Sequence, residues 1–259
     1  MSNSAANLVA LGTIVRREIV RIVRIWTQTL IPPAITMTLY FVIFGKLIGS
    51  RIGTIQGGFS YMQYIVPGMV MMSVINSCYA NISSSFFGAK FSRAVEEMLV
   101  SPMPNWVILL GYVTGAVSRG MVVGLLVLLI ALFFTSLHVM HPLIAFLSVL
   151  LGSAIFSLAG FINAVYAKKF DDVALVPTFI LTPLTYLGGV FYSVSMLAEP
   201  WQAISRVNPI LYMVNAFRFG VLGISDVNIG AAFAVMLAFV VGLSIVALQL
   251  LKRGVGLRS

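Results

Sequence analysis

Long apolar segments alternate with short charged ones along the whole chain. Charged side chains are absent from residues 52–89, 120–167, 173–198 and 227–251. A helix that crosses a bilayer needs about 20 apolar residues, so the longer stretches can hold more than one crossing. The pattern predicts six spans, at about 30–48, 61–85, 105–134, 143–166, 173–189 and 230–251. We therefore expect an all-α integral membrane protein, in which residues 1–259 form a single transmembrane domain.

The segment ahead of the first span has the pattern of a helix that lies on the membrane surface. Within residues 8–26, one helical face is apolar (Val15, Ile19, Ile22, Val23, Trp26) and the other is basic (Arg16, Arg17, Arg21, Arg24). This combination is typical of interfacial helices. Such a helix could serve only to keep the N-terminus in the cytoplasm, or it could contact a partner subunit. The span that follows starts beside Pro32 and Pro33, which a helix tolerates in its first turn.

A second amphipathic segment, residues 86–100, follows the second span. One face of the helix predicted there is apolar (Phe87, Phe91, Ala94, Val95, Met98, Leu99), and another is charged (Lys90, Arg93, Glu97). Pro102 and Pro104 end it. The segment could be a linker. Its length and its charges of both signs favour docking of a partner protein over contact with lipid alone.

Residues 191–224, between the fifth and sixth spans, do not fit a full crossing. The part from 207 to 224 is apolar, but Arg218 would lie inside a span placed there. A seventh span would also put the basic C-terminal tail outside the cell. We therefore expect a re-entrant or interfacial pair of helices on the outer side.

Basic residues are distributed unevenly over the two sides that six spans define. Eleven of the sixteen Lys and Arg residues fall on the side of the termini: Arg16, Arg17, Arg21, Arg24, Lys90, Arg93, Lys168, Lys169, Lys252, Arg253 and Arg258. The positive-inside bias therefore predicts that both termini are cytoplasmic. Composition agrees with a membrane protein, since 60% of the residues are hydrophobic and only 9% are charged. Anionic lipid headgroups account for the net charge of +9 better than nucleic acid does.

The sequence contains no pattern that is typical of an enzyme. The single cysteine, Cys78, lies in an apolar segment, and His138 and His141 share a short loop that has no carboxylate. The chain has no phosphate-binding G-x-x-x-x-G-K-[ST] motif, and the predicted spans contain no acidic residue that could relay protons or sodium ions. We therefore expect a chain that is not an enzyme and that binds no metal or cofactor itself.

The third span contains an arginine and two patterns of small residues. Placing Arg119 in hydrocarbon would cost about 3 kcal/mol, so it should face protein or water. Alternatively, the helix begins below the bilayer and carries Arg119 to headgroup level. Gly111-x-x-x-Gly115 and Gly120-x-x-x-Gly124 are typical of closely packed helices, although such patterns are common in membranes.

Three passages in this order resemble ABC-2-type transport permeases, with the greatest likeness to inner-membrane members of that family. They are VEEMLVSPMPNWVILLG (95–111), FDDVALVPTFILTPLTYLGGVFYSV (170–194) and VNPILYMVNAFRFG (207–220). The resemblance covers nearly the whole chain. It implies a six-span subunit that forms a homodimer, docks onto two copies of a separate ABC ATPase and exports a substrate. ATP and Mg would bind to that partner.

The resemblance also implies roles for individual residues. The ATPase would contact a coupling helix and a second, smaller segment at 167–173, through Phe87, Lys90, Phe91, Arg93, Ala94, Glu96, Glu97, Met98, Leu99, Ser101, Lys168, Lys169, Asp171 and Asp172. The substrate would pass between two subunits along spans 2 and 5. The polar groups there are Asn76, Asn81, Thr178, Thr182, Thr185 and Tyr186, which could instead bond to neighbouring helices. The outer element would close the exit, with Asn208, Pro209, Tyr212 and Arg218.

Members of this family often carry amphipathic, lipid-linked or drug-like molecules, and we expect a substrate of that kind. Two other classes stay open. A gradient-driven secondary transporter or channel would need no ATPase, and a structural or assembly protein would move no substrate. Neither alternative explains the amphipathic segment 86–100 together with the outer element.

Overall fold

The computed structural model describes residues 3–54 and 58–256, so Arg258 of the basic tail lies outside the described residues. Six helical segments of the described chain are long and apolar enough to cross a membrane. No β-strand forms in these ranges, where a lone bridge joins Thr54 and Ser60. The predicted all-α membrane fold with six candidate spans is confirmed.

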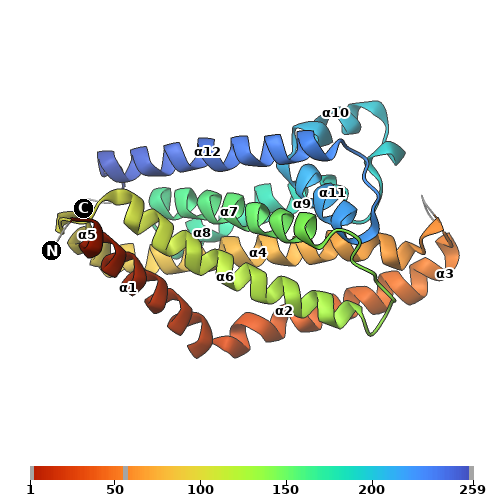
Figure 1. Cartoon of the computed structure of the whole chain (residues 1–259), viewed down its shortest axis with the longest axis horizontal. Helices are drawn as coiled ribbons and strands as arrows, with labels where there is room; N and C mark the ends of the chain where they lie inside the picture. The colour runs from red at the N-terminus through yellow and green to blue at the C-terminus, as the bar shows by residue number, and fades with distance from the viewer. Residues whose placement is uncertain (1–2, 55–57, 257–259) are drawn as a thin grey trace.

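The helices follow one another in the order that Figure 1 shows. Their bounds are α1 (Asn3–Arg24), α2 (Trp26–Tyr40), the π-helix η1 (Phe41–Ile48), α3 (Gly49–Ile52), α4 (Tyr61–Phe91), α5 (Ala94–Val100), α6 (Asn105–Ala131), α7 (Pro142–Tyr166), α8 (Phe170–Val176), the π-helix η3 (Pro177–Leu181), α9 (Thr182–Leu187), the 3-10 helix η4 (Val194–Met196), α10 (Glu199–Val207), α11 (Pro209–Leu222) and α12 (Ile229–Arg253).

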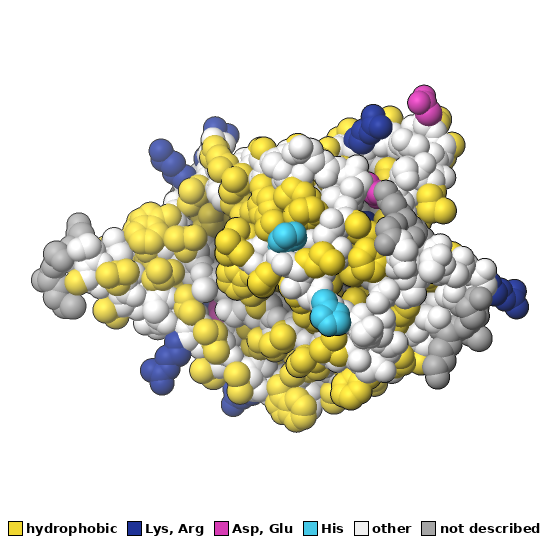
Figure 2. All heavy atoms as spheres, turned by 45° about the vertical axis from the view of Figure 1, so that its right-hand side comes forward, with side chains coloured by type: hydrophobic (Ala, Val, Ile, Leu, Met, Phe, Trp, Pro, Cys, Tyr) yellow, Lys and Arg dark blue, Asp and Glu magenta, His cyan; other side chains and the backbone are white. Residues whose placement is uncertain are grey.

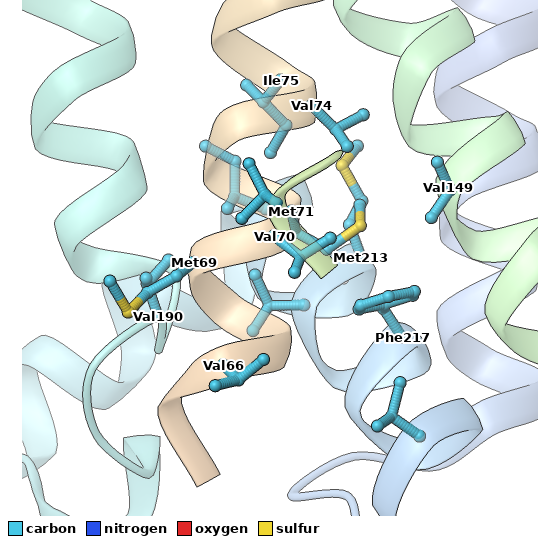
Figure 3. Close-up of a cluster of buried hydrophobic side chains, with 14 of the residues drawn as sticks. Val66, Met69, Val70, Met71, Val74, Ile75, Val149, Val190, Met213 and Phe217 are labelled. Atoms are coloured by element: carbon cyan, nitrogen blue, oxygen red, sulfur yellow. The ribbon is translucent and has the colours of Figure 1, made fainter. Parts of the chain in front are cut away.

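The long helix α4 forms the centre of the bundle. It starts with a capping box, in which the Gln63 N–H donates to Ser60 Oγ and the Ser60 N–H donates to Gln63 Oε1. Its side chains pack against α6, α7 and α11, as Figure 3 shows for a cluster that includes Met71, Val149 and Met213. Most of α4 is buried, whereas α2, α8–α9 and α12 each have few buried residues. The less buried helices are thus the ones available to lipid or to another subunit.

Both glycine patterns of α6 are used for close packing. A Cβ on Gly111 or Gly115 would collide with Ile14 or Glu18 of α1, and one on Gly120 or Gly124 with side chains of α4. The missing side chains therefore let α6 approach α1 on one side and α4 on the other.

The first span starts earlier than the sequence indicated. A turn at Ile25 separates α1 from α2, which begins at Trp26, so Pro32 and Pro33 lie inside the helix and not in its first turn. Each of these prolines lacks the N–H that would bond to the carbonyl four residues earlier. The fifth span also starts earlier than expected, at Phe170, and the third helix ends at Ala131.

The two ends of the molecule differ in what they carry. Both termini and α5 lie at one end in Figure 1, and α3, α10 and α11 lie at the other. Figure 2 shows hydrophobic side chains across the middle of one face, with basic side chains at its margins. Below, the end with the termini is called the inner end and the opposite end the outer end. That α10 and α11 re-enter the membrane stays a prediction.

Candidate functional site

The inner end brings together two segments that are far apart in the sequence. The last turns of α4, against which α5 packs, lie beside the first turn of α8. These are the segments 86–100 and 167–173, for which the family resemblance implied contact with a partner. They form one continuous surface, which we call the inner surface.

The helix predicted over residues 86–100 is divided into two. The central helix α4 continues to Phe91, and α5 begins at Ala94 after a turn at Ser92 and Arg93. Arg93 has a φ of 60°, a left-handed conformation that ends an α-helix. The prediction of a single helix is therefore wrong, because a helical pattern of side chains does not reveal a residue that leaves the helical backbone conformation.

Three phenylalanines join the two halves of the inner surface. The ring centroid of Phe87 lies 4.9 Å from that of Phe170, and the Phe91 centroid lies 5.2 Å from Phe170. Phe87 is buried, whereas Phe91 and Phe170 are 68% and 60% exposed. Val100 at the end of α5 is 87% exposed. Exposed aromatic rings held by a buried one are typical of a surface that binds a partner.

Lys90 is directed into the protein and away from the inner surface. Its ammonium donates hydrogen bonds to the carbonyl oxygens of Val165 and Ala167, both at 2.6 Å. These carbonyls stand at the C-terminus of α7, where a cation is favoured by the helix dipole. Lys90 thereby connects α4 to the end of α7, and its ammonium group is bonded to carbonyls of its own chain.

Asp172 has a comparable role at the start of α8. Its Oδ2 accepts the backbone N–H groups of Lys168 at 2.8 Å and Lys169 at 2.9 Å. These bonds fix the turn between α7 and α8 and so set the position of Phe170. The side chains of Lys168, Lys169 and Asp171 are exposed around it.

The remaining predicted contact residues lie on or beside α5. Arg93 and Glu97 are exposed, and Ala94, Glu96, Met98, Leu99 and Ser101 are partly buried. Met98 and Leu99 pack against the core of the inner end, and the Ser101 hydroxyl donates to the Met98 carbonyl at 2.7 Å. The inner surface thus consists of a packed base with charged and aromatic side chains on top.

A polar cluster joins α1 to α4 beneath this surface. Glu18 is only 1% exposed and accepts hydrogen bonds from the Ser85 hydroxyl at 2.8 Å to both of its oxygens. It also pairs with Arg21 at 3.2 Å and Arg17 at 3.4 Å. The sequence pattern did not point to Glu18, because a carboxylate on a surface helix is ordinarily solvated. The one signal was its spacing of four from Ile14, which puts both on the face toward Gly111 and Gly115.

Two arginines of this cluster converge on one neutral amide. The Oδ1 atom of Asn81 accepts Nη2 of Arg21 at 2.8 Å and Nη1 of Arg119 at 3.4 Å. The backbone carbonyl of Asn81 accepts Arg21 as well, at 3.1 Å. Arg21 therefore binds α4, although it shares one side of α1 with Arg16, Arg17 and Arg24, as the sequence predicted. Arg21 belongs to α1 and Arg119 to α6. Because both bind the same Asn81 oxygen, Arg119 lies at the same depth in the bundle as Arg21 of α1.

A pocket of about 280 Å³ lies beside Arg119, between α2 and α4. Its polar lining groups are Gln28, Thr36, Ser73, Asn76, Ser77 and Arg119. Asn76 is exposed there, and its amide donates to the Met72 carbonyl at 3.0 Å. Asn81, by contrast, is fully buried in the cluster described above. Of the two asparagines predicted on a substrate path, only Asn76 lines the open pocket.

The threonines predicted on the path bond to their own helix. The hydroxyls of Thr178, Thr182 and Thr185 donate to the carbonyls of Ala174, Pro177 and Leu181 at 2.7–2.9 Å. Thr185 is buried, whereas Thr178 and Thr182 lie on the exposed side of α8–α9 together with Tyr186. Tyr186 stacks on Phe191 at a centroid distance of 5.9 Å.

At the outer end, the N-P-x-x-Y passage builds the start of α11. Asn208 Oδ1 accepts the Ile210 N–H at 3.0 Å, and the Asn208 amide donates to the Leu184 carbonyl of α9 at 2.6 Å. Pro209 occupies the first helical position, and the Tyr212 hydroxyl donates back to the Arg206 carbonyl at 2.7 Å. These groups are engaged within the chain.

Arg218 is buried at the centre of the outer end, with 1% of its surface exposed. It donates to the carbonyls of Gly189 at 2.7 Å and Tyr64 at 3.4 Å, and its guanidinium lies 4.1 Å from the Tyr64 ring centroid. Asp226 is nearby and accepts the Ser193 hydroxyl at 2.8 Å. Arg218 thus connects α11 to α4 and to the turn after α9.

The histidines form no metal site in the described part of the chain. His141 precedes α7, and its ring stacks on Phe219 at a centroid distance of 5.0 Å. No group of three or more His, Cys, Asp or Glu side chains that could hold a metal occurs among the described residues.

Comparison with known proteins agrees with this architecture. Residues 9–222 match the family described as ABC-2 type transporter. The chain is 57% identical over 251 residues to "Inner membrane transport permease YadH" of Escherichia coli K12, covering 97% of this chain and 98% of the relative. It is 26% identical over 221 residues to "Nodulation protein J" of Rhizobium meliloti, covering 83% and 82%. The six apolar helices and the first relative place the chain in the inner membrane, as a multi-pass protein. The resemblance seen in the sequence is confirmed, and the chain belongs to the ABC-2 type transporter family.

Proposed function

We propose that this permease is the membrane half of an ATP-driven exporter that works as a homodimer with two copies of a separate ATPase. The inner surface is the observation that supports this most. Two segments separated by some seventy residues of chain meet there, and they leave Phe91 and Phe170 exposed at the end that carries both termini. A bundle that only conducted a solute would need no such surface.

The inner surface is suited to transmitting movement. Phe170 begins α8, and α8–α9 forms a span with few internal contacts. Phe91 ends α4, the most buried span. A partner that pulls on both rings would therefore move a lightly held helix relative to a fixed one. In this proposal the termini are cytoplasmic, as the distribution of basic residues predicts.

The substrate route in this proposal follows the exposed side of α4. Met72, Asn76, Ala80 and Ser84 recur every four residues on one side of that helix, and Asn76, Ala80 and Ser84 are exposed. At the outer end this side is closed by an aromatic cluster, in which Phe191 stacks on Phe44 and on Tyr186. Outward release would require these rings to separate. The outer helices α10 and α11 hold the segment that carries Phe191.

The experiment is purification of the full chain through a C-terminal tag, in mild detergent or nanodiscs, with mass analysis of what accompanies it. An ATPase chain in a ratio of one to one, whose ATP turnover changes with added amphipathic compounds, is the expected result. A homo-oligomer without ATPase, under conditions that keep a known complex of this family intact, would contradict the proposal. Transport driven by an ion gradient alone would then point to a secondary transporter.

A further inference from the structure

The pocket between α2 and α4 has an uncompensated positive charge at its inner end. Arg119 lines this pocket and donates to Asn81 Oδ1 at the long distance of 3.4 Å. That oxygen is already held by Arg21 at 2.8 Å, and the nearby Glu18 is shared by Arg17 and Arg21. Arg119 pairs with no carboxylate among the described residues, and its Nε is buried without a hydrogen-bond partner. A guanidinium at this depth is costly unless an anion compensates it.

Other donors without full partners line the same pocket. Ser77 lines the pocket and is only 6% exposed, and its hydroxyl has no hydrogen-bond partner among the described residues. Buried hydroxyls are nearly always bonded, so an unbonded one in the wall of a pocket indicates a ligand that completes it. The side chains of Gln28 and Asn76 lie around it and can donate as well. Arginine, hydroxyl and amide donors together are suited to the oxygens of a phosphate group.

The outer part of the pocket is mainly apolar. Pro32, Pro33 and Met37 of α2 and Met72 of α4 line it, together with the small hydroxyl side chains Thr36 and Ser73. From Gln28 to Thr36, it extends about 12 Å along the helix axis, at 1.5 Å per residue. Its polar end lies at the level where α1 passes into α2, and the exposed side chains Ile19 and Val23 of α1 and Trp26 of α2 are available to lipid there. This places the charged end at headgroup depth and the apolar end deeper in the bilayer.

We propose that this pocket binds the phosphate-type anionic headgroup of an amphipathic molecule taken from the cytoplasmic leaflet. Arg119 compensates the anion, Ser77 and Asn76 donate hydrogen bonds to it, and the hydrocarbon part lies along Met37 and Met72. The inference rests on the proposed function only in treating this molecule as the cargo.

The test is lipid binding to the purified full chain, measured by native mass spectrometry in mild detergent without any ATPase. Phosphatidylglycerol, phosphatidylcholine with the same acyl chains, and glycerol phosphate are compared. We expect phosphatidylglycerol to bind about tenfold more tightly than phosphatidylcholine, since it forms charge-assisted hydrogen bonds without a cationic headgroup. Glycerol phosphate should bind far more weakly. If it binds as tightly as the lipid, the site takes a soluble phosphate and the amphipathic ligand is wrong.

Two pairs of variants test whether the preference for phosphatidylglycerol over phosphatidylcholine comes from the pocket. Arg119→Gln should abolish this preference. Arg16→Gln removes an equal charge at an exposed site of α1 and should leave the preference unchanged. If Arg16→Gln weakens it equally, the preference belongs to the basic surface of α1. Ser77→Ala removes one oxygen and adds no atoms to the pocket wall, and it should weaken the binding of phosphatidylglycerol about fivefold. Its control is Ser118→Ala, because the Ser118 hydroxyl bonds to Thr114 of its own helix.

The outcomes separate this site from the proposed exporter. A lipid preference that depends on Arg119 supports the site even if no ATPase accompanies the chain. No preference in the wild-type chain would overturn the site, even if an ATPase is found. If Arg119→Gln does not fold, the Ser77→Ala and Ser118→Ala pair decides the question alone, since equal binding by both would overturn the pocket.

Discussion

The two ends of this bundle treat their polar and aromatic residues in opposite ways. At the outer end, Asn208, Tyr212 and Arg218 are engaged by carbonyls and rings of their own chain. At the inner end, Phe91 and Phe170 remain exposed while Lys90 and Asp172 hold the base beneath them. Residues from equally distinctive sequence passages are therefore structural at one end and available to a partner at the other. We therefore expect substitutions at the outer end to change stability and substitutions at the inner end to change binding of the partner.

The largest expected effect is on stability, at Arg218. Arg218→Ala removes the donors to Gly189 and Tyr64 and leaves those buried carbonyls without partners. We expect a loss of about 3 kcal/mol, or roughly 10 °C in Tm. Thermal unfolding in detergent measures it. Arg206→Ala, at an exposed arginine of the same end, is the control, and an equal Tm for the two variants would contradict the anchoring role.

The next effect is on binding, at the exposed phenylalanines. In the double variant Phe91→Ala and Phe170→Ala, the ATPase recovered with the tagged permease should fall about tenfold or more, because exposed aromatics are typical binding hot spots. Tm should hardly change. Trp201→Ala, at an exposed aromatic of the outer end, is the matched control. Undiminished recovery in the double variant would exclude the inner surface as the docking site.

A smaller loss of stability is expected at Asn208. Asn208→Ala removes the cap of α11 and the bond to the Leu184 carbonyl, at a cost of about 1 kcal/mol. Asn208→Asp keeps the capping oxygen but loses the amide donor, so its Tm should lie between those of wild type and Asn208→Ala. If Asn208→Ala unfolds at the wild-type temperature, the bonds at this position contribute nothing to stability.

The smallest effect is expected from the charges of α5. Glu96→Lys with Glu97→Lys reverses charge on one side of that helix and should weaken ATPase recovery a few-fold, since charges at the rim of an interface mainly change the rate of association. Insertion into the membrane should be intact, as judged by yield in the membrane fraction. Recovery at the wild-type ratio in low salt would show that these glutamates do not face the partner.

Several parts of the site could be predicted from the sequence because they depend on spacing alone. The apolar residues around Phe91 and the two glycine pairs of α6 are local patterns, and helical geometry fixes which residues share a face. The break at Arg93 and the inward turn of Lys90 could not be predicted. The first depends on one backbone conformation, and the second on carbonyls of α7 some seventy-five residues away.

By itself, the sequence determined that this protein lies in a membrane and that it has six apolar helices, because hydrocarbon demands long apolar runs with every backbone group bonded within a helix. It also determined the family. Only the tertiary structure decided what the polar residues do. It placed Glu18 of α1 against Ser85 and Arg21 against Asn81. It brought residues 86–100 to residues 167–173, and it left Arg119 beside a pocket with no carboxylate partner among the described residues. The physical reason is that a buried charge is defined by its neighbours in space, and these come from helices that the order of residues does not pair.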